Sequence, residues 1–332
     1  MPLNFKILPK VELHLHLDCS LSYEVVKVLN PEITYDEYRN EFIAPIGCTG
    51  LSDYIARASR GIELMQTKEQ LRLVTLDLFR QLKADDVIYA EIRFAPLLHI
   101  EKGLTPSEVV ETINNAALEG IEKTGVEASI ILCTLRHYSE EQSMETVKLA
   151  HAFNGTLVRG FDIAADEAGY PLNNHIKAFK YARENNIHCT AHAGEAKGAE
   201  SVRETLEQLR PARIGHGVRS AEDEQLLKTI KKNDIHLEIC PTSNILTKVY
   251  RRIEDHSIDM LYNKQISLSV NTDGRTISDV TLTDEFKKLH TVFNWQASHF
   301  KECTLEAIKH SFTNKSTKLK LKNIVADSYK EL

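Results

Sequence analysis

The sequence predicts an α/β protein that folds as a (β/α)₈ TIM barrel with a helical insertion after the first strand. Eight short apolar runs alternate along the chain with segments of helical periodicity, and eight parallel strands with helical crossovers close a barrel. No low-complexity linker or short-period repeat divides the 332 residues. A chain of this length with 42% hydrophobic residues can bury one large core. We therefore expect a single barrel over residues 1–332.

The first predicted strand covers residues 11–18, where four apolar residues alternate with Glu12, His14, His16 and Asp18. Strict alternation places every second side chain on the same face of a strand. His14 and His16 therefore point the same way, and two imidazoles about 7 Å apart along a strand can converge on one metal ion. Asp18 follows on that face.

Residues 19–86 have helical periodicity and no convincing strand. Thr67 and Gln70 have the spacing of a capping box for a helix that runs to Leu82. Two interpretations of this insertion stay open at this point. It forms a lid over a site beside His14 and His16, or it is ordinary packing around the barrel.

The next strand is predicted at residues 87–96, and a helix follows from Thr105, with Pro106 and Glu108 in its first turn, to about Lys123. Strand-like apolar runs then recur after each helical segment. They cover residues 128–136, 157–166, 187–195, 212–217, 235–242 and 265–273.

Histidine and acidic residues gather at five of the predicted strand ends. Catalytic residues of a (β/α)₈ barrel lie at the C-terminal ends of its strands. Each residue alone has an ordinary structural explanation, such as a core histidine or a turn-forming acid. As a set we expect them to converge on one site: His14 and His16, Asp166 and Glu167, His192 and Glu195, His216, and Asp273.

These residue types predict a mononuclear zinc centre. Nitrogen and oxygen donors with one position open to water suit catalytic Zn²⁺, and zinc brings the pKa of that water near neutrality. Glu195 is placed to exchange protons with a substrate without binding the metal. His216 is then a base or an electrostatic partner of the attacking water. No lysine ends the strand at 157–166 to bridge a second metal, so we expect one Zn²⁺ per chain, held by His14, His16, His192 and Asp273.

The composition of the chain narrows the classes of molecule that it is expected to bind and the compartment in which it is expected to work. The net charge is −6 and the pI is about 6.2, which disfavours nucleic acid and favours a small uncharged substrate. Six scattered cysteines without a C-x-x-C pair are typical of free thiols in a reducing compartment. With no apolar run of about 18 residues and no signal-like N-terminus, we expect a cytoplasmic protein that does not enter membranes. The sequence leaves the oligomeric state open.

Six motifs follow one another along the chain. They are P-K-V-E-L-H-L-H-L-D at 9–18, D-I-A-A-D-E at 162–167, H-A-G-E at 192–195, G-H-G at 215–217, C-P-T-S-N at 240–244 and S-V-N-T-D at 269–273. In this order the motifs resemble the adenosine deaminase family over most of the chain. The resemblance implies a mononuclear zinc amidohydrolase barrel of purine salvage, which converts adenosine and 2′-deoxyadenosine to the inosine forms plus ammonia.

The resemblance also implies a role for each matching residue. His14, His16, His192 and Asp273 take the zinc positions, and His16 also lies at the substrate position. Glu195 takes the position that protonates purine N1, and His216 stands beside the attacking water. Asp18 matches the residue that holds a ribose hydroxyl, and Ala165 matches the residue whose backbone N–H meets purine N3.

Three residues depart from the family pattern: Cys19 and Ala165, which are commonly Gly, and Gly274, which is often a second Asp that bonds purine N7. An unpaired buried nitrogen costs roughly 1–3 kcal/mol, so a water, the Gly274 N–H or Arg275 must replace that Asp.

Two alternatives therefore stay open. The enzyme acts on another aminopurine, such as adenine, AMP with Arg275 meeting its phosphate, or a modified adenine nucleoside. Otherwise the chain is a non-catalytic purine-binding relative, although such a protein is expected to have lost Glu195, His216 or a ligand, and none is lost.

Overall fold

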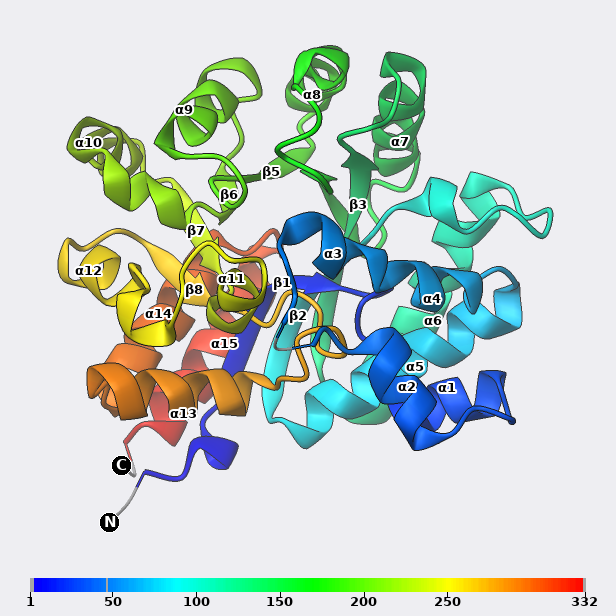
Figure 1. Cartoon of the computed structure of the whole chain (residues 1–332), viewed down its shortest axis with the longest axis horizontal. Coiled ribbons are helices and arrows are strands. Elements are labelled where there is room, and N and C mark those ends of the chain that lie inside the picture. Colours follow the sequence, from blue (N-terminus) through cyan, green and yellow to red (C-terminus); the bar gives the residue numbers. More distant parts are fainter. Residues whose placement is uncertain (1–2, 46, 331–332) are drawn as a thin grey trace.

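The computed structural model describes residues 3–45 and 47–330, which form a barrel of parallel strands surrounded by helices (Figure 1). Within them, eight strands pair in sequence order, each parallel to the next. The ring closes where Leu15 forms a parallel bridge with Asp273. The strands are β1 (Lys10–His16), β2 (Val87–Phe94), β3 (Glu127–Leu135), β4 (Val158–Ala164), β5 (His188–Ala193), β6 (Arg213–His216), β7 (His236–Ile239) and β8 (Leu268–Val270).

Helices fill every connection between consecutive strands. The segment between β1 and β2 holds α1 (Tyr23–Leu29), α2 (Tyr35–Phe42), α3 (Leu51–Ala56), α4 (Ala58–Glu63) and α5 (Lys68–Ala84). The later connections hold α6 (Pro106–Thr124), α7 (Glu140–Ala152), α8 (Ile176–Glu184), α9 (Ala199–Gln208), α10 (Glu224–Lys232), α11 (Pro241–Leu246) and α12 (Ile258–Asn263). After β8 come α13 (Leu282–Phe293), α14 (Ala297–His310) and α15 (Lys315–Ser328). Short 3₁₀ turns are η1 (Phe5–Ile7), η2 (Pro96–Leu98), η3 (Asn173–His175), η4 (Val218–Glu222) and η5 (Ile253–Asp255).

The eight-stranded fold predicted from the sequence is confirmed, and the differences lie at strand ends. β1 ends at His16, two residues earlier than predicted, and the Ser20 hydroxyl donates to the carbonyl of His16 at 2.6 Å. β8 is only three residues long. Beyond β8, the side chain of Asn271 replaces a backbone carbonyl as the hydrogen-bond partner of β1, because its Oδ1 accepts from the N–H of Leu13 at 2.7 Å.

Both predicted helix starts are present, with different caps. The Thr67 side chain accepts from the N–H of Gln70, but Gln70 Oε1 accepts from the N–H of Gln66, so only half of the capping box forms. Thr105 and Glu108 form both bonds of a capping box at the start of α6. These caps fix the first turns of the two helices that cover β2 and β3.

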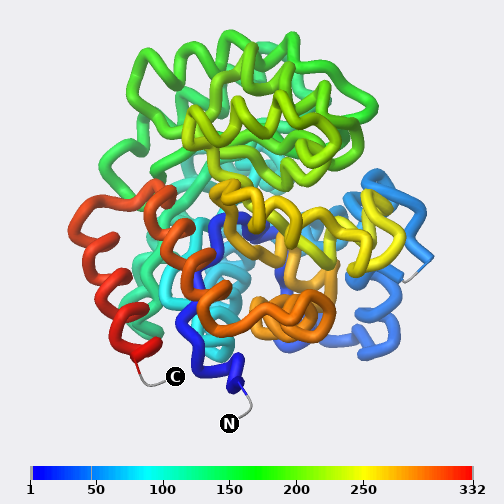
Figure 2. The backbone as a smooth tube through the Cα atoms, turned by 90° about the vertical axis from the view of Figure 1, so that its left-hand side faces the viewer, coloured from blue at the N-terminus to red at the C-terminus, as the bar shows by residue number. Residues whose placement is uncertain are grey.

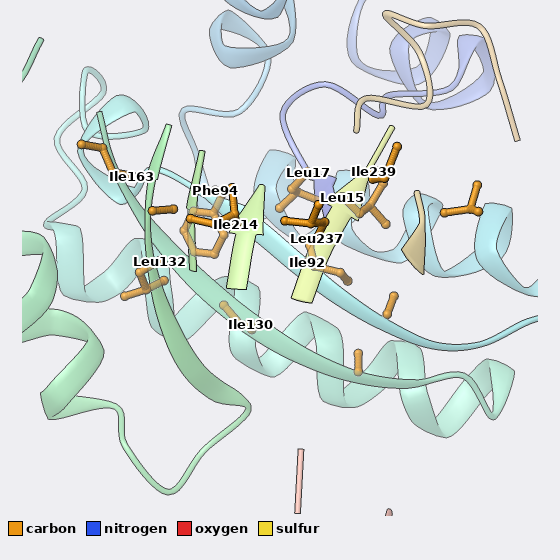
Figure 3. Packing of buried hydrophobic residues seen from close by; sticks show 14 of the residues in the cluster. Leu15, Leu17, Ile92, Phe94, Ile130, Leu132, Ile163, Ile214, Leu237 and Ile239 are labelled. Atoms are coloured by element: carbon orange, nitrogen blue, oxygen red, sulfur yellow. The ribbon is translucent and has the colours of Figure 1, made fainter. Parts of the chain in front are cut away.

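The main core lies between the strands and the surrounding helices, and Figure 3 shows its packing around residues such as Phe94, Leu132 and Ile214. A second cluster packs Val11 and Leu13 of β1 against α14 and α15. The last two helices thus cover the outer face of β1, next to the point where the barrel closes.

Charged side chains fill part of the barrel interior. Arg93 of β2 lies 2.7 Å from both Asp162 of β4 and Glu238 of β7, and Arg213 of β6 pairs with Glu238 and with Glu91. Each of these side chains is fully buried. Although burial acts to raise it, the charges of Arg93 and Arg213 hold the pKa of Glu238 well below its usual range. The network therefore keeps fixed carboxylates inside the barrel.

The insertion lies beside the segment that follows β7, as both views of the chain show (Figures 1 and 2). Ala44, Tyr54 and Ala58 share an apolar cluster with Ile277, and Leu246 of α11 packs against it. Within the described residues, no helix combines the length and the apolar composition needed to cross a membrane.

Candidate active site

Four strands end in backbone turns that aim side chains and amides into the mouth of the barrel. Ala165 after β4, Gly194 after β5, His216 at the end of β6 and Asp273 after β8 have φ of 78°, 71°, 59° and 68°. This left-handed region disfavours residues with a side chain, and such strain gathers at functional sites. The candidate site residues thus lie in or beside turns with a strained backbone conformation.

Four donor atoms at this mouth have the spacing of ligands around one metal ion. His16 Nε2 lies 3.2 Å from His192 Nε2, and both His14 Nε2 and His16 Nε2 lie 3.4 Å from Asp273 Oδ1. Donors about 2.0–2.1 Å from a tetrahedral Zn²⁺ are about 3.4 Å apart. His14 Nε2 is buried without a hydrogen-bond partner among the described residues. These residues fit a zinc ion.

Buried carboxylates orient two of these imidazoles. His14 Nδ1 lies 2.8 Å from Glu238 Oε2, and His192 Nδ1 lies 3.1 Å from Asp162 Oδ2. Each Nδ1–H donates to its carboxylate and leaves Nε2 free to face the site. Partners of this kind fix the tautomer of metal-binding histidines. Arg93 joins Asp162 and Glu238, so one guanidinium supports both partners.

His216 stands apart from these donors, although it is close enough to share a metal. One donor atom each from His14, His192, His216 and Asp273 lies within 4.8 Å of the others. However, His216 Nδ1 lies 3.1 Å from the amide nitrogen of Asn244, and its Nε2 lies 3.5 Å from Glu195 Oε2. Both ring nitrogens of His216 therefore face other groups.

Glu195 is held in a form suited to giving up a proton. Burial, followed by the charges of Asp273 and Glu167, raises the pKa of Glu195 well above its usual range. The carboxylate of Glu167 accepts the N–H groups of Gly194, Glu195, Ala196 and Lys197, at 2.6 to 3.0 Å, and so shapes the turn that carries Glu195. A buried carboxylic acid near neutral pH is a general acid.

A pocket of about 400 Å³ opens over these residues. One wall comes from the insertion, with Leu51, Ile55 and Ile62 of α3 and α4. The described residues that line it include four acids, Asp18, Asp166, Glu195 and Asp273, and no lysine or arginine. The pocket is thus apolar on one side and acidic at its floor.

Most of the predicted site residues meet in this pocket. The described lining includes His16, Asp18, Ala165, His192, Glu195, His216 and Asp273. His14 is fully buried beneath it, next to Asp273. Gly274 is not in the lining, and Glu167 supports the Glu195 turn instead of facing the pocket.

The family model described as adenosine deaminase matches residues 9–328. The chain belongs to the adenosine deaminase family. Proteins named adenosine deaminase from Clostridium perfringens and Clostridium acetobutylicum are 35% identical over 327 residues and 36% identical over 321 residues. The matches cover 96% and 95% of this chain and 98% and 96% of the relatives. The chain is therefore an enzyme, a hydrolase of the adenosine deaminase type.

Solved structures with a similar fold carry names that differ in the aminopurine. An adenine deaminase from Arthrobacter aurescens is 25% identical, with a TM-score of 0.90 over 97% of this chain and 99% of that one. An N6-methyl-AMP deaminase from Arabidopsis thaliana is 24% identical, with a TM-score of 0.85 over 99% of both chains. These likenesses show the fold, and the substrate of this member of the adenosine deaminase family is argued below from its pocket.

The departure at Gly274 has a structural explanation. A Cβ added to Gly274 would lie 2.6 Å from Cys19 Cβ, 3.0 Å from Cys19 O and 3.3 Å from Tyr54 Oη. Cys19 itself lines the pocket. In this member of the adenosine deaminase family, the residue after Asp18 therefore fills the space that a side chain at position 274 would need.

The suggestion that Arg275 serves the substrate is wrong. Its guanidinium lies 2.7 Å from Asp85 and 3.1 Å from Glu12, it is only 5% exposed, and it does not line the pocket. Asp85 also accepts the N–H groups of Leu282 and Thr283 at the start of α13. Arg275 thus joins β1, the end of α5 and α13 and is unavailable to a phosphate or to purine N7.

Sequence reasoning missed the residues that orient the site: Asp162, Glu238, Ser243 and Asn244. Ser243 Oγ donates to Asp273 Oδ2 at 2.7 Å, and Asn244 contacts His216. One signal was available, because charged residues within otherwise apolar strands, such as Arg93 and Glu238, must find partners when buried.

Proposed function

We propose that the protein is a zinc-dependent hydrolase that deaminates adenosine and 2′-deoxyadenosine to inosine and 2′-deoxyinosine, releasing ammonia. The observation that carries the proposal is the spacing of donor atoms from His14, His16, His192 and Asp273, with the buried acid Glu195 beside them. These four residues would hold one Zn²⁺. That ion supplies a water activated for attack at neutral pH.

The other residues of the site transfer protons or hold the metal-binding side chains in place. Glu195, protonated because its pKa is raised, gives its proton to purine N1 as the amidine carbon is attacked. His216 lies 3.5 Å from Glu195, where it would face the attacking water. Ser243 holds Asp273 by its second oxygen, so that Oδ1 stays directed at His14 and His16.

The lining of the pocket favours a neutral nucleoside. Burial raises the pKa of Asp18 to about 6, so Asp18 is mostly ionised at pH 7 and accepts a ribose hydroxyl. A 5′-phosphate at about 4 Å from this carboxylate would be repelled by roughly 4 kcal/mol at an effective dielectric near 20. A volume of about 400 Å³ has room for a sugar as well as a purine, because ligand pockets span about 300–1,000 Å³.

A second candidate is deamination of free adenine. It is favoured by the similarity to the adenine deaminase from Arthrobacter aurescens, which is 25% identical. A free base would leave Asp18 without a hydroxyl partner, which favours the nucleoside.

We also propose that α3 and α4 act as a lid on this single barrel, because Leu51, Ile55 and Ile62 line the pocket and closing lids exclude water. The role would be purine salvage. A cytoplasmic location is supported by the scattered cysteines, which are free thiols.

Product analysis tests the proposed activity. Zinc-loaded protein is incubated with adenosine, and inosine and ammonia are quantified, with heat-inactivated protein as the blank. We expect one inosine and one ammonia for each adenosine consumed. Unchanged adenosine, or adenine as the product, would contradict the proposal.

A further inference from the structure

His216 stands at the end of a chain of hydrogen bonds that begins at a backbone amide. The N–H of Ile258, at the start of α12, donates to His256 Nδ1 at 3.0 Å. His256 Nε2 lies 3.2 Å from Asn244 Oδ1, and Asn244 Nδ2 lies 3.1 Å from His216 Nδ1. All four residues are buried. The chain joins α12, the residue after η5, α11 and the end of β6.

A backbone N–H can only donate, and it therefore sets the direction of the whole chain. Nδ1 of His256 must accept, so its neutral ring carries the proton on Nε2. That N–H donates to Oδ1 of Asn244, which turns the amide NH₂ toward His216. Nδ1 of His216 then accepts, and the proton of His216 is on Nε2.

The surroundings keep this arrangement in place. Burial lowers the pKa of His256 to about 3, so the ring is neutral near pH 7. The ring of Tyr250 packs against it with centroids 4.7 Å apart, and Tyr250 Oη donates to the carbonyl of Val218 at 3.2 Å. The N–H of Asn244 donates to Cys240 O at 3.0 Å.

We propose that Asn244 and His256 are positioning residues that hold His216 as the tautomer protonated on Nε2. In the proposed deamination His216 would then donate a hydrogen bond to the attacking hydroxide and would not act as a base. The proton of the water would be lost to solvent before the attack, because a bound zinc ion would lower the pKa of that water. The same N–H faces Glu195 Oε2 at 3.5 Å, while Glu195 Oε1 is buried without a hydrogen-bond partner among the described residues. Because Oε2 faces this N–H as an acceptor, Oε1 is the oxygen left to carry the proton that Glu195 would give to a substrate.

The catalytic part of this inference rests on the proposed deamination, but the tautomer does not. Long-range ¹H–¹⁵N spectra of zinc-loaded protein with ¹⁵N-labelled histidine distinguish the two tautomers and need no substrate. His216→Gln identifies the His216 signals. We expect His216 to carry its proton on Nε2.

Asn244→Asp reverses one bond of the chain without changing the shape of the side chain, because a carboxylate accepts where the amide donated. We expect the proton of His216 to move to Nδ1 and kcat for adenosine to fall by about 10²–10⁴-fold. KM should change by less than about threefold, since the substrate contacts stay.

His256 gives a matched pair. His256→Gln keeps a donor near the position of Nε2 and should retain kcat within about threefold, whereas His256→Phe removes the donor and should lower kcat at least about tenfold. His236→Gln controls for the loss of a buried histidine, because His236, at the start of β7, hydrogen-bonds only with Ser267 and Ser269 among the contacts described for it.

A wild-type His216 protonated on Nδ1, or Asn244→Asp with unchanged tautomer and kcat, would overturn the inference. Failure of the adenosine assay alone would count against the proposed function only.

Discussion

At the scale of single residues, the proposed chemistry depends most on Glu195, because burial raises the pKa of this carboxyl well above its usual range. Glu195→Gln keeps the shape of the side chain but cannot give up a proton, so we expect turnover to fall at least about 10²–10⁴-fold. Zinc content and inosine binding should be unchanged, as measured by metal analysis and calorimetry. Near-normal turnover would remove Glu195 from the role of proton donor.

The contact between Gly274 and Cys19 is a second residue-scale feature that can be measured. Gly274→Ala places a Cβ 2.6 Å from Cys19 Cβ, and such overpacking typically costs about 1–3 kcal/mol. Cys19→Gly in the same chain removes this contact and should recover most of the loss in free energy of unfolding. A double-mutant cycle by denaturant unfolding checks it, and additive effects of the two changes would show that the side chains do not compete for this space.

The sequence was enough to predict that His14, His192 and Asp273 meet at one site, because each is a possible ligand near the end of a strand. Contacts between side chains on elements distant in sequence could not be predicted. The spacing of the chain gives no sign that Asn244 reaches His216 or that Arg275 turns toward Asp85, because both depend on how loops pack after the barrel has closed.

At the scale of elements, α4 docks through a glycine against the segment that follows β1. A Cβ on Gly61 would lie 2.4 Å from the carbonyl oxygen of Asp18 and 3.2 Å from Leu21 Cδ1. Gly61→Ala should therefore displace α4 or Asp18 and raise KM for adenosine several-fold, with a smaller change in kcat. Gly47→Ala in the same insertion is the control, because nothing lies within 4 Å of its added Cβ. Equal kinetics for the two variants would exclude this coupling.

The positions of all eight strands could be predicted, because eight apolar runs recur between helical segments and each run forms a strand. The residues at which the strands end were harder to predict. β1 and β8 stop early where side chains of Ser20 and Asn271 replace backbone partners, and such substitutions leave no trace in hydrophobic periodicity. Hydrophobic periodicity also does not show where the separate helices of the insertion pack.

At the scale of the whole molecule, the barrel brings donor atoms from distant strands together at one site that fits a metal ion. We expect one Zn²⁺ per purified chain, because the donor spacing fits a single ion. His192→Ala removes one donor and should lose metal and activity together. Elemental analysis checks both proteins, with His236→Ala as a control distant from the site. Two ions per chain, or activity without metal, would contradict the mononuclear site.

We expect this pocket to select a neutral adenine nucleoside, and a comparison of kcat/KM among four substrates decides the point. Zinc-loaded protein is assayed with adenosine, 2′-deoxyadenosine, adenine and AMP at one pH and ionic strength. Because Asp18 in the pocket lining would accept a ribose hydroxyl and repel a phosphate, the kcat/KM values for adenosine and 2′-deoxyadenosine should exceed the other two by at least about 100-fold. A higher kcat/KM for AMP or for adenine would contradict the account.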